Sequence, residues 1–269
     1  MRRGMAVLLA GLLVGAVCCQ VARALTAREI LDKAKTLDDT TRHWTDRTQR
    51  MTLVITDGGG ATRRRELTVY TKRYSADEEK AITFLSAPAE LHGVGFLQWS
   101  HRGRDDEQWL YLPELKRTRQ IAARLRDESF VGTDFTFRDL QILTDLLRWT
   151  EAEAPTHLSG EEAVAEHVCE TIELRPKLES MPYGRIVLWM DRDALTPRRL
   201  DFFDLDAARV KTLSLEDIRD LGPIPTPHHL EMQNLKKGSR TVVDLTDVKY
   251  NTGLADDLFT QRYLERGGP

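Results

Sequence analysis

The hydrophobic and polar positions of the chain follow two different periods. Between residues 27 and 37 the apolar side chains recur every three or four positions, which predicts an amphipathic helix. Thr26 precedes this segment and Glu29 follows three positions later, the spacing of a capping box at a helix start. From residue 51 onward apolar and polar residues alternate, which is typical of strands with one buried face.

The alternating part of the chain predicts a long antiparallel meander. The runs 51–56 and 67–72 flank the turn sequence Asp-Gly-Gly-Gly at 57–60, which predicts a β-hairpin. Further strands are expected at 80–85, 93–100, 108–112, 117–121, 168–175, 184–191, 197–203, 210–218, 229–235 and 239–250. So many strands exceed what a flat open sheet accommodates, and we therefore expect the sheet to curl.

Two segments interrupt the alternation. Residues 87–92 are expected to be irregular or helical, and residues 134–149 carry apolar side chains at near-helical spacing. We expect Asp134 to cap the helix that follows it. No linker or change of composition divides residues 25–269, so we expect a single domain there.

A curled sheet has a concave face, and strand alternation predicts which residues supply it. These residues are Met51, Leu53, Ile55, Leu200, Phe202, Leu213 and Leu215. Helices that lie on this face would either fill it or leave a cavity.

The N-terminus has the layout of a secretory signal peptide. Arg2 and Arg3 precede an apolar run at 5–17, which is shorter than the roughly 20 residues of a spanning helix. A small-x-small site then predicts cleavage after Ala24, so that residues 1–24 are removed and the mature protein enters the periplasm. The alternative is a lipid anchor at Cys18 or Cys19, but neither has a branched apolar residue three positions earlier.

Charge and cysteine content narrow the possible functions. The chain has 39 basic and 42 acidic side chains, a net charge of -3, which does not favour nucleic acid as a partner. Cleavage after Ala24 would remove three arginines and two of the three cysteines. The net charge would change from -3 to -6, and Cys169 would be the only cysteine left. We expect Cys169 to be a buried small apolar residue.

No constellation of catalytic residues is recognisable, so we predict neither an enzyme nor a cofactor. His228 and His229 are adjacent in a predicted strand and would face opposite sides, which argues against a metal site. Asp191 and Asp193 occupy a predicted turn, where carboxylates usually accept hydrogen bonds from the turn itself. An exposed, solubilising hairpin tip is expected at 63–65 (Arg-Arg-Arg), with anionic lipid or an acidic partner as the alternative contact.

The middle of the chain is its most distinctive part. It contains Gln-Trp-Leu-Tyr-Leu-Pro at 108–113, Lys-Arg-Thr-Arg-Gln-Ile at 116–121 and Ser-Phe-Val-Gly-Thr-Asp-Phe-Thr-Phe-Arg-Asp-Leu at 129–140. Phe-Leu-Ser-Ala-Pro at 84–88, Gly-Val-Gly-Phe-Leu at 93–97 and Leu-Trp-Met-Asp at 188–191 accompany these segments. Together they resemble the LolA-like outer-membrane lipoprotein-sorting family of exported bacterial proteins. The family usually has Gly-Ser-Asp-Phe where this chain has Gly-Thr-Asp-Phe at 132–135.

The resemblance implies a mainly β (α+β) fold, an incomplete and strongly curved antiparallel β-barrel of about eleven strands with helices plugging its concave side. It also implies a periplasmic carrier that holds the acyl chains of a lipid or lipoprotein in an apolar cavity on the way to the outer membrane. The partners would be the acylated cargo, an inner-membrane transporter of the resistance-nodulation-division (RND) type and an outer-membrane acceptor. The dedicated lipoprotein carrier lacks the block at 108–113, so the cargo need not be a lipoprotein. The alternative is an accessory subunit of an RND-type lipid exporter that carries nothing.

Aromatic residues and two arginines are the candidate ligand-binding residues. The candidates for the cavity wall or a movable lid are Phe96, Trp99, Trp109, Phe130, Asp134, Phe135 and Trp189. Arg124 and Arg126 are candidates to contact a lipid phosphate at the cavity mouth. For each aromatic residue, ordinary core packing is the alternative.

Overall fold

The computed structural model of the protein describes residues 24–75, 77–101, 106–122, 126–178 and 181–268. The predicted signal peptide, apart from Ala24, and the candidate Arg124 lie outside the described residues. No helix in the described part of the chain is long and apolar enough to cross a membrane.

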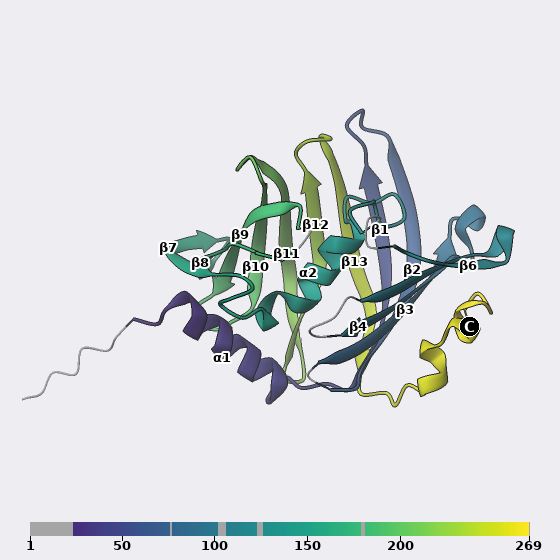
Figure 1. Cartoon of the computed structure of the whole chain (residues 1–269), viewed down its shortest axis with the longest axis horizontal. Helices are drawn as coiled ribbons and strands as arrows, with labels where there is room; N and C mark the ends of the chain where they lie inside the picture. The colour runs from purple at the N-terminus through teal and green to yellow at the C-terminus, as the bar shows by residue number, and fades with distance from the viewer. Residues whose placement is uncertain (1–23, 76, 102–105, 123–125, 179–180, 269) are drawn as a thin grey trace, which may run out of the picture.

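The described strands form one antiparallel sheet (Figure 1). The first six are β1 (Asp46–Thr56), β2 (Thr62–Arg73), β3 (Glu78–Ala87), β4 (Gly95–His101), β5 (Glu107–Leu112) and β6 (Arg117–Gln120). The other seven are β7 (Thr156–Val164), β8 (His167–Leu174), β9 (Tyr183–Asp191), β10 (Pro197–Asp204), β11 (Arg209–Leu221), β12 (Ile224–Asn234) and β13 (Ser239–Tyr250). The sheet thus has thirteen strands, where alternation along the sequence predicts twelve and the family resemblance implies about eleven.

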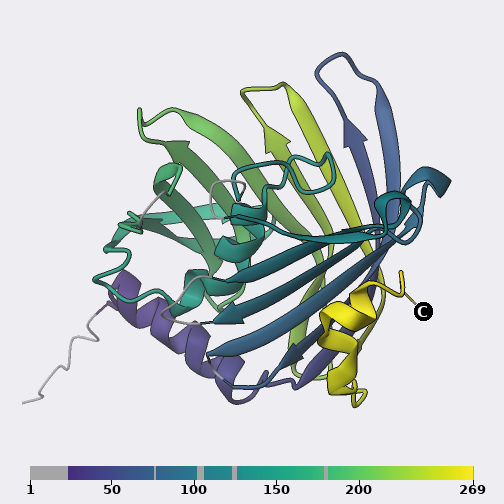
Figure 2. The ribbon, with the colours of Figure 1, turned by 45° about the vertical axis from the view of Figure 1, so that its right-hand side comes forward.

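The strand order explains how the chain is arranged in space. It runs β6-β5-β4-β3-β2-β1-β13-β12-β11-β10-β9-β8-β7, so every neighbouring pair except β1 and β13 is consecutive in the sequence. The two edge strands, β6 and β7, are also consecutive, but they lie at opposite edges. The described residues between these strands, 121–122 and 126–155, therefore belong to a segment that crosses between the two edges. This crossing segment runs over the face of the curved sheet shown toward the viewer in Figures 1 and 2.

The crossing segment contains the helix α2 (Phe137–Asp145), which the short 3-10 helix η4 (Leu146–Arg148) extends. The helix begins with a capping box in which Thr136 is the N-cap and Asp139 is the third helical residue. The prediction that Asp134 caps this helix is wrong. Asp134 lies two residues too early, and its carboxylate accepts hydrogen bonds from Ser239 and Thr241 of β13 instead.

The N-terminal helix α1 (Ala27–Asp39) confirms the sequence prediction. The Oγ1 of Thr26 accepts a hydrogen bond from the backbone N–H of Glu29, and the Glu29 carboxylate accepts one from the backbone N–H of Thr26. The buried residues Ile30 and Leu31 of α1 are part of the main hydrophobic core. The helix packs against η4 and the edge strand β7, so it meets the end of the crossing segment.

One strand was missed, whereas the segment expected to be irregular or helical contains a short helix. The strand β7 has an exposed pattern and a register shift near Gly160, and an edge strand of this kind does not show apolar alternation. Within 87–92 the structure has the 3-10 helix η1 (Ala89–Leu91), and a second one, η2 (Pro113–Leu115), follows β5.

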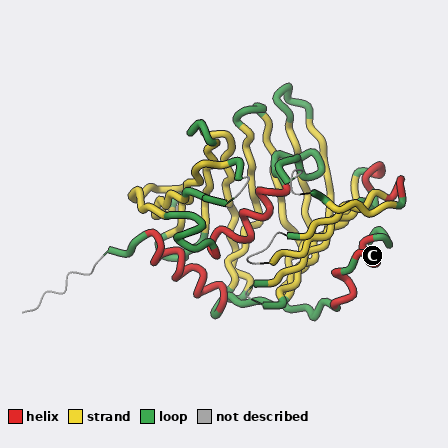
Figure 3. Tube along the Cα trace, in the orientation of Figure 1, coloured by secondary structure: helices red, strands yellow, loops and turns green. Residues whose placement is uncertain are grey.

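The C-terminus lies on the opposite face of the sheet from α2 (Figures 1 and 3). It consists of η5 (Asp256–Phe259) and the short helix α3 (Gln261–Leu264). Below, the face that meets α2 is called the inner face, and the face that meets α3 is called the outer face. Leu258, Phe259 and Leu264 pack there against outer-face residues of β3, β4 and β5, which form a second, smaller core.

Candidate functional site: a pocket between the sheet and the crossing segment

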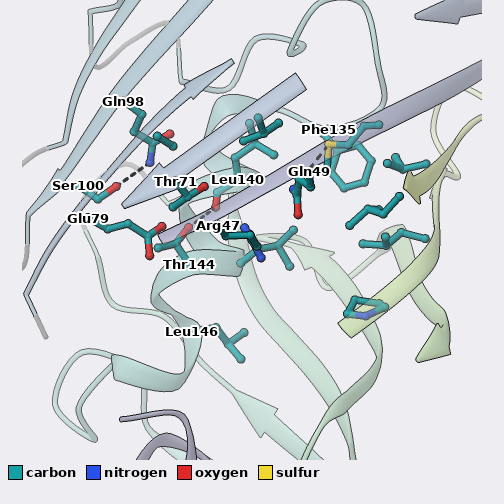
Figure 4. Close-up of a pocket in the computed structure, with 18 of the residues that line it drawn as sticks. Arg47, Gln49, Thr71, Glu79, Gln98, Ser100, Phe135, Leu140, Thr144 and Leu146 are labelled. Carbon is teal, nitrogen blue, oxygen red and sulfur yellow. Dashed lines mark hydrogen bonds between the residues drawn. The ribbon is translucent and has the colours of Figure 1, made fainter. Parts of the chain in front are cut away.

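A pocket of about 440 Å³ lies between the inner face of the sheet and the crossing segment (Figure 4). Its volume falls in the range of roughly 300–1,000 Å³ that is usual for small-molecule sites. Its apolar wall consists of Met51, Leu53, Leu67, Val69, Phe96, Phe130, Phe135, Leu140, Leu143, Leu146, Leu147, Leu200, Leu213, Leu215, Leu230, Val243 and Leu245. The wall therefore combines side chains from both halves of the sheet with side chains from α2 and η4.

Strand pairing explains why the apolar side chains collect here. Met51 pairs with Leu67 across β1 and β2, and Leu53 pairs with Val243 across β1 and β13. Residues that are directly opposite in neighbouring strands point to the same face, so the apolar positions of successive strands form continuous rows. Five of the seven predicted concave-face residues, Met51, Leu53, Leu200, Leu213 and Leu215, line the pocket. The other two, Ile55 and Phe202, are buried but are not part of its wall.

One end of the pocket is polar. Going from β1 to β5, successive cross-strand partners form a row of Arg47, Thr71, Ala81, Gln98 and Gln108. The next row toward the apolar end starts with Gln49, and the row after it starts with Met51. The inner face thus changes from polar to apolar along the direction of β1.

Charged residues surround the polar end. Lys35 and Arg148 both pair with Asp39, at 2.9 and 3.2 Å, and Arg73 pairs with Glu79 at 3.0 Å. Burial would raise the pKa of Asp39, but hydrogen bonds and charge from Lys35 and Arg148 outweigh it and lower the pKa. The pKa of the neighbouring Asp38 is raised, because its burial outweighs the attraction of nearby arginines.

Three of the predicted aromatic residues line the pocket. Phe96 lies on β4, and Phe130 and Phe135 lie in the crossing segment. The Phe96 ring centroid is 5.5 Å from that of Phe130 and 5.2 Å from that of Phe137, the first residue of α2. These edge-on and tilted contacts attach the start of the crossing segment to β4.

The three predicted tryptophans lie on the outer face, away from the pocket. Trp99 and Trp109 pack edge to face with centroids 4.9 Å apart, and the Trp99 indole N–H donates to the carbonyl oxygen of Phe259. Trp189 packs with Cys169 and donates to Glu162. In β4, Trp99 has the opposite parity to the pocket residues Phe96 and Gln98. In β9, Trp189 has the opposite parity to Leu188 of the main core, and this parity decides the face.

The polar candidates have structural partners. Asp134 is 5% exposed, and its backbone N–H donates to the Thr241 hydroxyl while its carboxylate accepts from that hydroxyl and from Ser239. Arg126 is buried and donates to the carbonyl oxygen of Asp106. Neither residue is part of the pocket wall.

The sequence prediction missed the polar end, which Arg47 and Gln49 begin. Both precede Met51 and Leu53 at intervals of two residues, so they continue the same inner-facing series of β1. The two-residue spacing from Met51 is therefore the signal in the sequence that places Arg47 and Gln49 on the inner face. Polarity alone does not indicate this placement, because polar residues at the start of a strand usually face solvent.

Other candidate chemistry has a structural explanation. Cys169 is buried, as predicted, and burial raises the pKa of its thiol. Asp191 accepts hydrogen bonds from the backbone N–H groups of Asp193 and Ala194, as predicted for a turn carboxylate. In the described ranges, no three His, Cys, Asp or Glu side chains cluster in a way that could hold a metal ion.

Comparisons with known proteins agree with this architecture. A family model described as "Uncharacterized protein" matches residues 77–266, more than two thirds of the chain. A crystal structure described as an outer membrane lipoprotein-sorting protein domain, from Vibrio parahaemolyticus, is 25% identical with a TM-score of 0.80. The match covers 89% of this chain and 98% of that one. The chain belongs to the family of that model, and it is similar to the outer membrane lipoprotein-sorting protein domain over nearly the whole of both chains.

Two further solved structures share the fold of this chain. A DUF1329 family protein from Desulfovibrio piger is 27% identical with a TM-score of 0.81, and the match covers 88% of this chain and 97% of that one. A LolA superfamily protein from Nitrosomonas europaea is 18% identical with a TM-score of 0.65, over 89% and 100% of the two chains. No curated protein sequence matches the chain.

Proposed function

We propose that the protein is a periplasmic carrier that holds the acyl chains of a lipid or lipoprotein in its pocket during transport to the outer membrane. The observation that carries this proposal is the apolar wall between the inner face of the sheet and the crossing segment. Similarity to the outer membrane lipoprotein-sorting protein domain supports it. Such a role needs no catalytic group.

In this proposal the curved sheet acts as an incomplete barrel, and α1, α2 and η4 plug its concave side. Residues 25–269 act as a single domain, and a signal peptide at 1–24 directs it to the periplasm. Phe96, Phe130 and Phe135 contact the acyl chain, and the segment from Phe130 to α2 is the part that moves when cargo enters. The donor would be an inner-membrane transporter of the RND type, and the acceptor would lie at the outer membrane.

The energetics of acyl chains fit a carrier of this kind. Burial of a sixteen-carbon chain is worth on the order of 13 kcal/mol, at about 0.8 kcal/mol per methylene group. Such a chain therefore leaves a membrane for water very slowly. A pocket with an apolar wall offers a comparable environment, so that transfer in either direction needs only a small difference in free energy.

The first experiment is native mass spectrometry of the mature protein purified from its own periplasm, combined with binding of a fluorescent fatty acid. We expect adducts whose fragments are lipid or acylated peptide. A bare mass together with no binding of the fatty acid would overturn the carrier proposal and favour the accessory subunit.

A matched pair of variants locates the binding. Leu215 lines the pocket, whereas Leu205 is 76% exposed in a turn. We expect Leu215→Trp, which adds bulk inside the pocket, to weaken fatty-acid binding by about tenfold or more, equivalent to about 1.4 kcal/mol. Leu205→Trp should bind like the unsubstituted protein. Equal binding by both variants would place the fatty acid elsewhere.

A further inference from the structure

Arg47 differs from the other cations of the pocket wall. These cations are Lys35, Arg47, Arg73 and Arg148, and the carboxylates of the wall are Asp38, Asp39 and Glu79. Lys35, Arg73 and Arg148 each pair with a wall carboxylate, and Asp38 lies 3.7 Å from Arg42. Among the described residues, Arg47 makes no ion pair, and its Nε is buried without a hydrogen-bond partner.

The guanidinium of Arg47 lies over the ring of Trp44, with its Cζ 5.1 Å from the ring centroid. Arg73 lies over the same ring with its Cζ at 3.7 Å, and Trp44 itself is 6% exposed. A guanidinium that stacks on a ring keeps its N–H groups available in the plane of the group. Arg47 is therefore a positioned cation whose donors are not used by the described part of the chain.

Gln49 supplies a second unused group two residues along the same strand. It is 4% exposed, and its Oε1 has no hydrogen-bond partner among the described residues. Its amide nitrogen makes only a long contact of 3.9 Å to the sulfur of Met51. Two residues of a strand span about 7 Å, so Arg47 and Gln49 offer a donor and an acceptor at that separation on one face. A buried polar atom without a partner is costly, which indicates that a ligand group satisfies it.

The apolar wall begins directly beyond these two residues. Met51 and Leu53 continue the inner-facing series of β1, and the distance from Arg47 to Leu53 along the strand is on the order of 20 Å. Figure 4 shows Arg47 and Gln49 beside the side chains of the crossing segment at the polar end. A molecule with a polar head and an apolar tail would thus lie with its head at Arg47.

We propose that the polar end of the pocket is a headgroup site for an anionic lipid, in which Arg47 binds an anionic oxygen and Gln49 accepts a hydrogen bond from a hydroxyl or amide of the same head. This inference rests on the proposed carrier function and specifies its cargo. The anionic oxygen could belong to a carboxylate, as in a free fatty acid, or to a phosphate diester, as in a phospholipid. Both would use the same charge-assisted hydrogen bonds to the guanidinium.

The test compares ligands that share a tail and differ in the head. One pair is palmitate, at a pH where its carboxyl is ionised, and hexadecanol. The other pair is phosphatidylglycerol and diacylglycerol with identical acyl chains. We expect the anionic member of at least one pair to bind about tenfold or more tightly, a preference that corresponds to about 1.4 kcal/mol. The pair that shows the larger preference identifies the carboxylate or the phosphate as the natural group.

Variants assign the preference to Arg47. In Arg47→Gln the anionic and neutral ligands should bind equally, at the affinity that the unsubstituted protein has for the neutral ligand. The control is Arg50→Gln, because Arg50 lies on the same strand but is 63% exposed and pairs with Asp247. Arg50→Gln should keep the full preference. Gln49→Leu should bind phosphatidylglycerol more weakly while binding diacylglycerol as before.

The outcomes separate the two proposals. If none of the four ligands binds, the carrier proposal itself fails. If the anionic and neutral ligands bind the unsubstituted protein equally, the carrier proposal stands and the headgroup site is refuted. The headgroup site is also refuted if Arg47→Gln keeps the preference or if Arg50→Gln loses it.

Discussion

Lys211 of β11 and Asp139 of α2 form a buried ion pair, with the Lys211 Nζ 2.6 Å from the Asp139 Oδ2. The hydroxyl of Tyr183 on β9 donates to the other oxygen of the same carboxylate at 2.7 Å. Burial and the adjacent carboxylate raise the pKa of Tyr183, so it remains a donor. Asp139 also completes the capping box of α2, and the sheet and the helix start are therefore joined through one carboxylate.

Removal of the lysine charge should destabilise the protein strongly. We expect Lys211→Met to lower the free energy of unfolding by about 3–5 kcal/mol, because it leaves Asp139 buried without a counter-charge. Urea unfolding measures this change. The control is Arg50→Met, which breaks the exposed pair with Asp247 and should cost less than about 1 kcal/mol. Equal losses in the two variants would contradict a special role for the buried pair.

The contact between Asp134 and Thr241 should be energetically coupled. These residues are 107 positions apart and exchange two hydrogen bonds that attach the crossing segment to β13. In a double-mutant cycle with Asp134→Ala and Thr241→Val, we expect a coupling free energy of about 1–3 kcal/mol. We also expect faster amide hydrogen exchange near residues 130–136 in Asp134→Ala. Additive effects would show that the two hydrogen bonds do not hold the segment.

Loss of an aromatic ring should weaken fatty-acid binding when the ring lies on the inner face, but not when it lies on the outer face. Trp109→Ala and Phe135→Ala each remove a buried ring and should each cost about 3–5 kcal/mol of unfolding free energy. Only Phe135 lines the pocket, so only Phe135→Ala should also weaken fatty-acid binding. Binding is measured at a temperature where both variants are folded. A binding defect confined to Trp109→Ala would contradict the assignment of the pocket to the inner face.

Asp191 should make stability dependent on pH in the acid range. Its burial raises its pKa, but hydrogen bonds from Ala194, Asp193 and Arg198 outweigh this effect and lower the pKa of the carboxyl. A carboxyl with a lowered pKa in the folded state contributes stability at neutral pH, and this contribution is lost as the pH falls below about 4. Asp191→Asn should therefore be less stable than the unsubstituted protein at pH 7, with a smaller difference near pH 3. The control is Asp193→Asn in the same turn, where the carboxylate is exposed and the difference should be small at both pH values.

Several elements could be predicted because their signals are local. The capping box at Thr26 and Glu29 involves residues three positions apart, and the turn around Asp191 involves residues two and three apart. The strands that alternate clearly were predicted for the same reason. The edge strand β7 was missed because most of its side chains are exposed on both faces, so its sequence carries no alternation.

The candidate site could be predicted only in part. Alternation shows that Phe96 and Trp99 point to opposite faces of β4, and therefore that both cannot line one cavity. It does not show which face receives the crossing segment. That choice depends on the packing of Phe130 and Phe137 against Phe96, which the spacing of these residues along the chain does not reveal.

The sequence by itself determined the period of each strand, the start of α1, the turn chemistry and the kind of fold that these predict. All of these arise from interactions between residues that are near one another in the chain. Only the tertiary structure decided that β1 pairs with β13, that α2 lies over the inner face, and that Arg47 and Gln49 lie at one end of an apolar pocket. The physical reason is that these contacts join segments as many as about 200 residues apart in the chain. They form only when the complete sheet has assembled and brings these segments together.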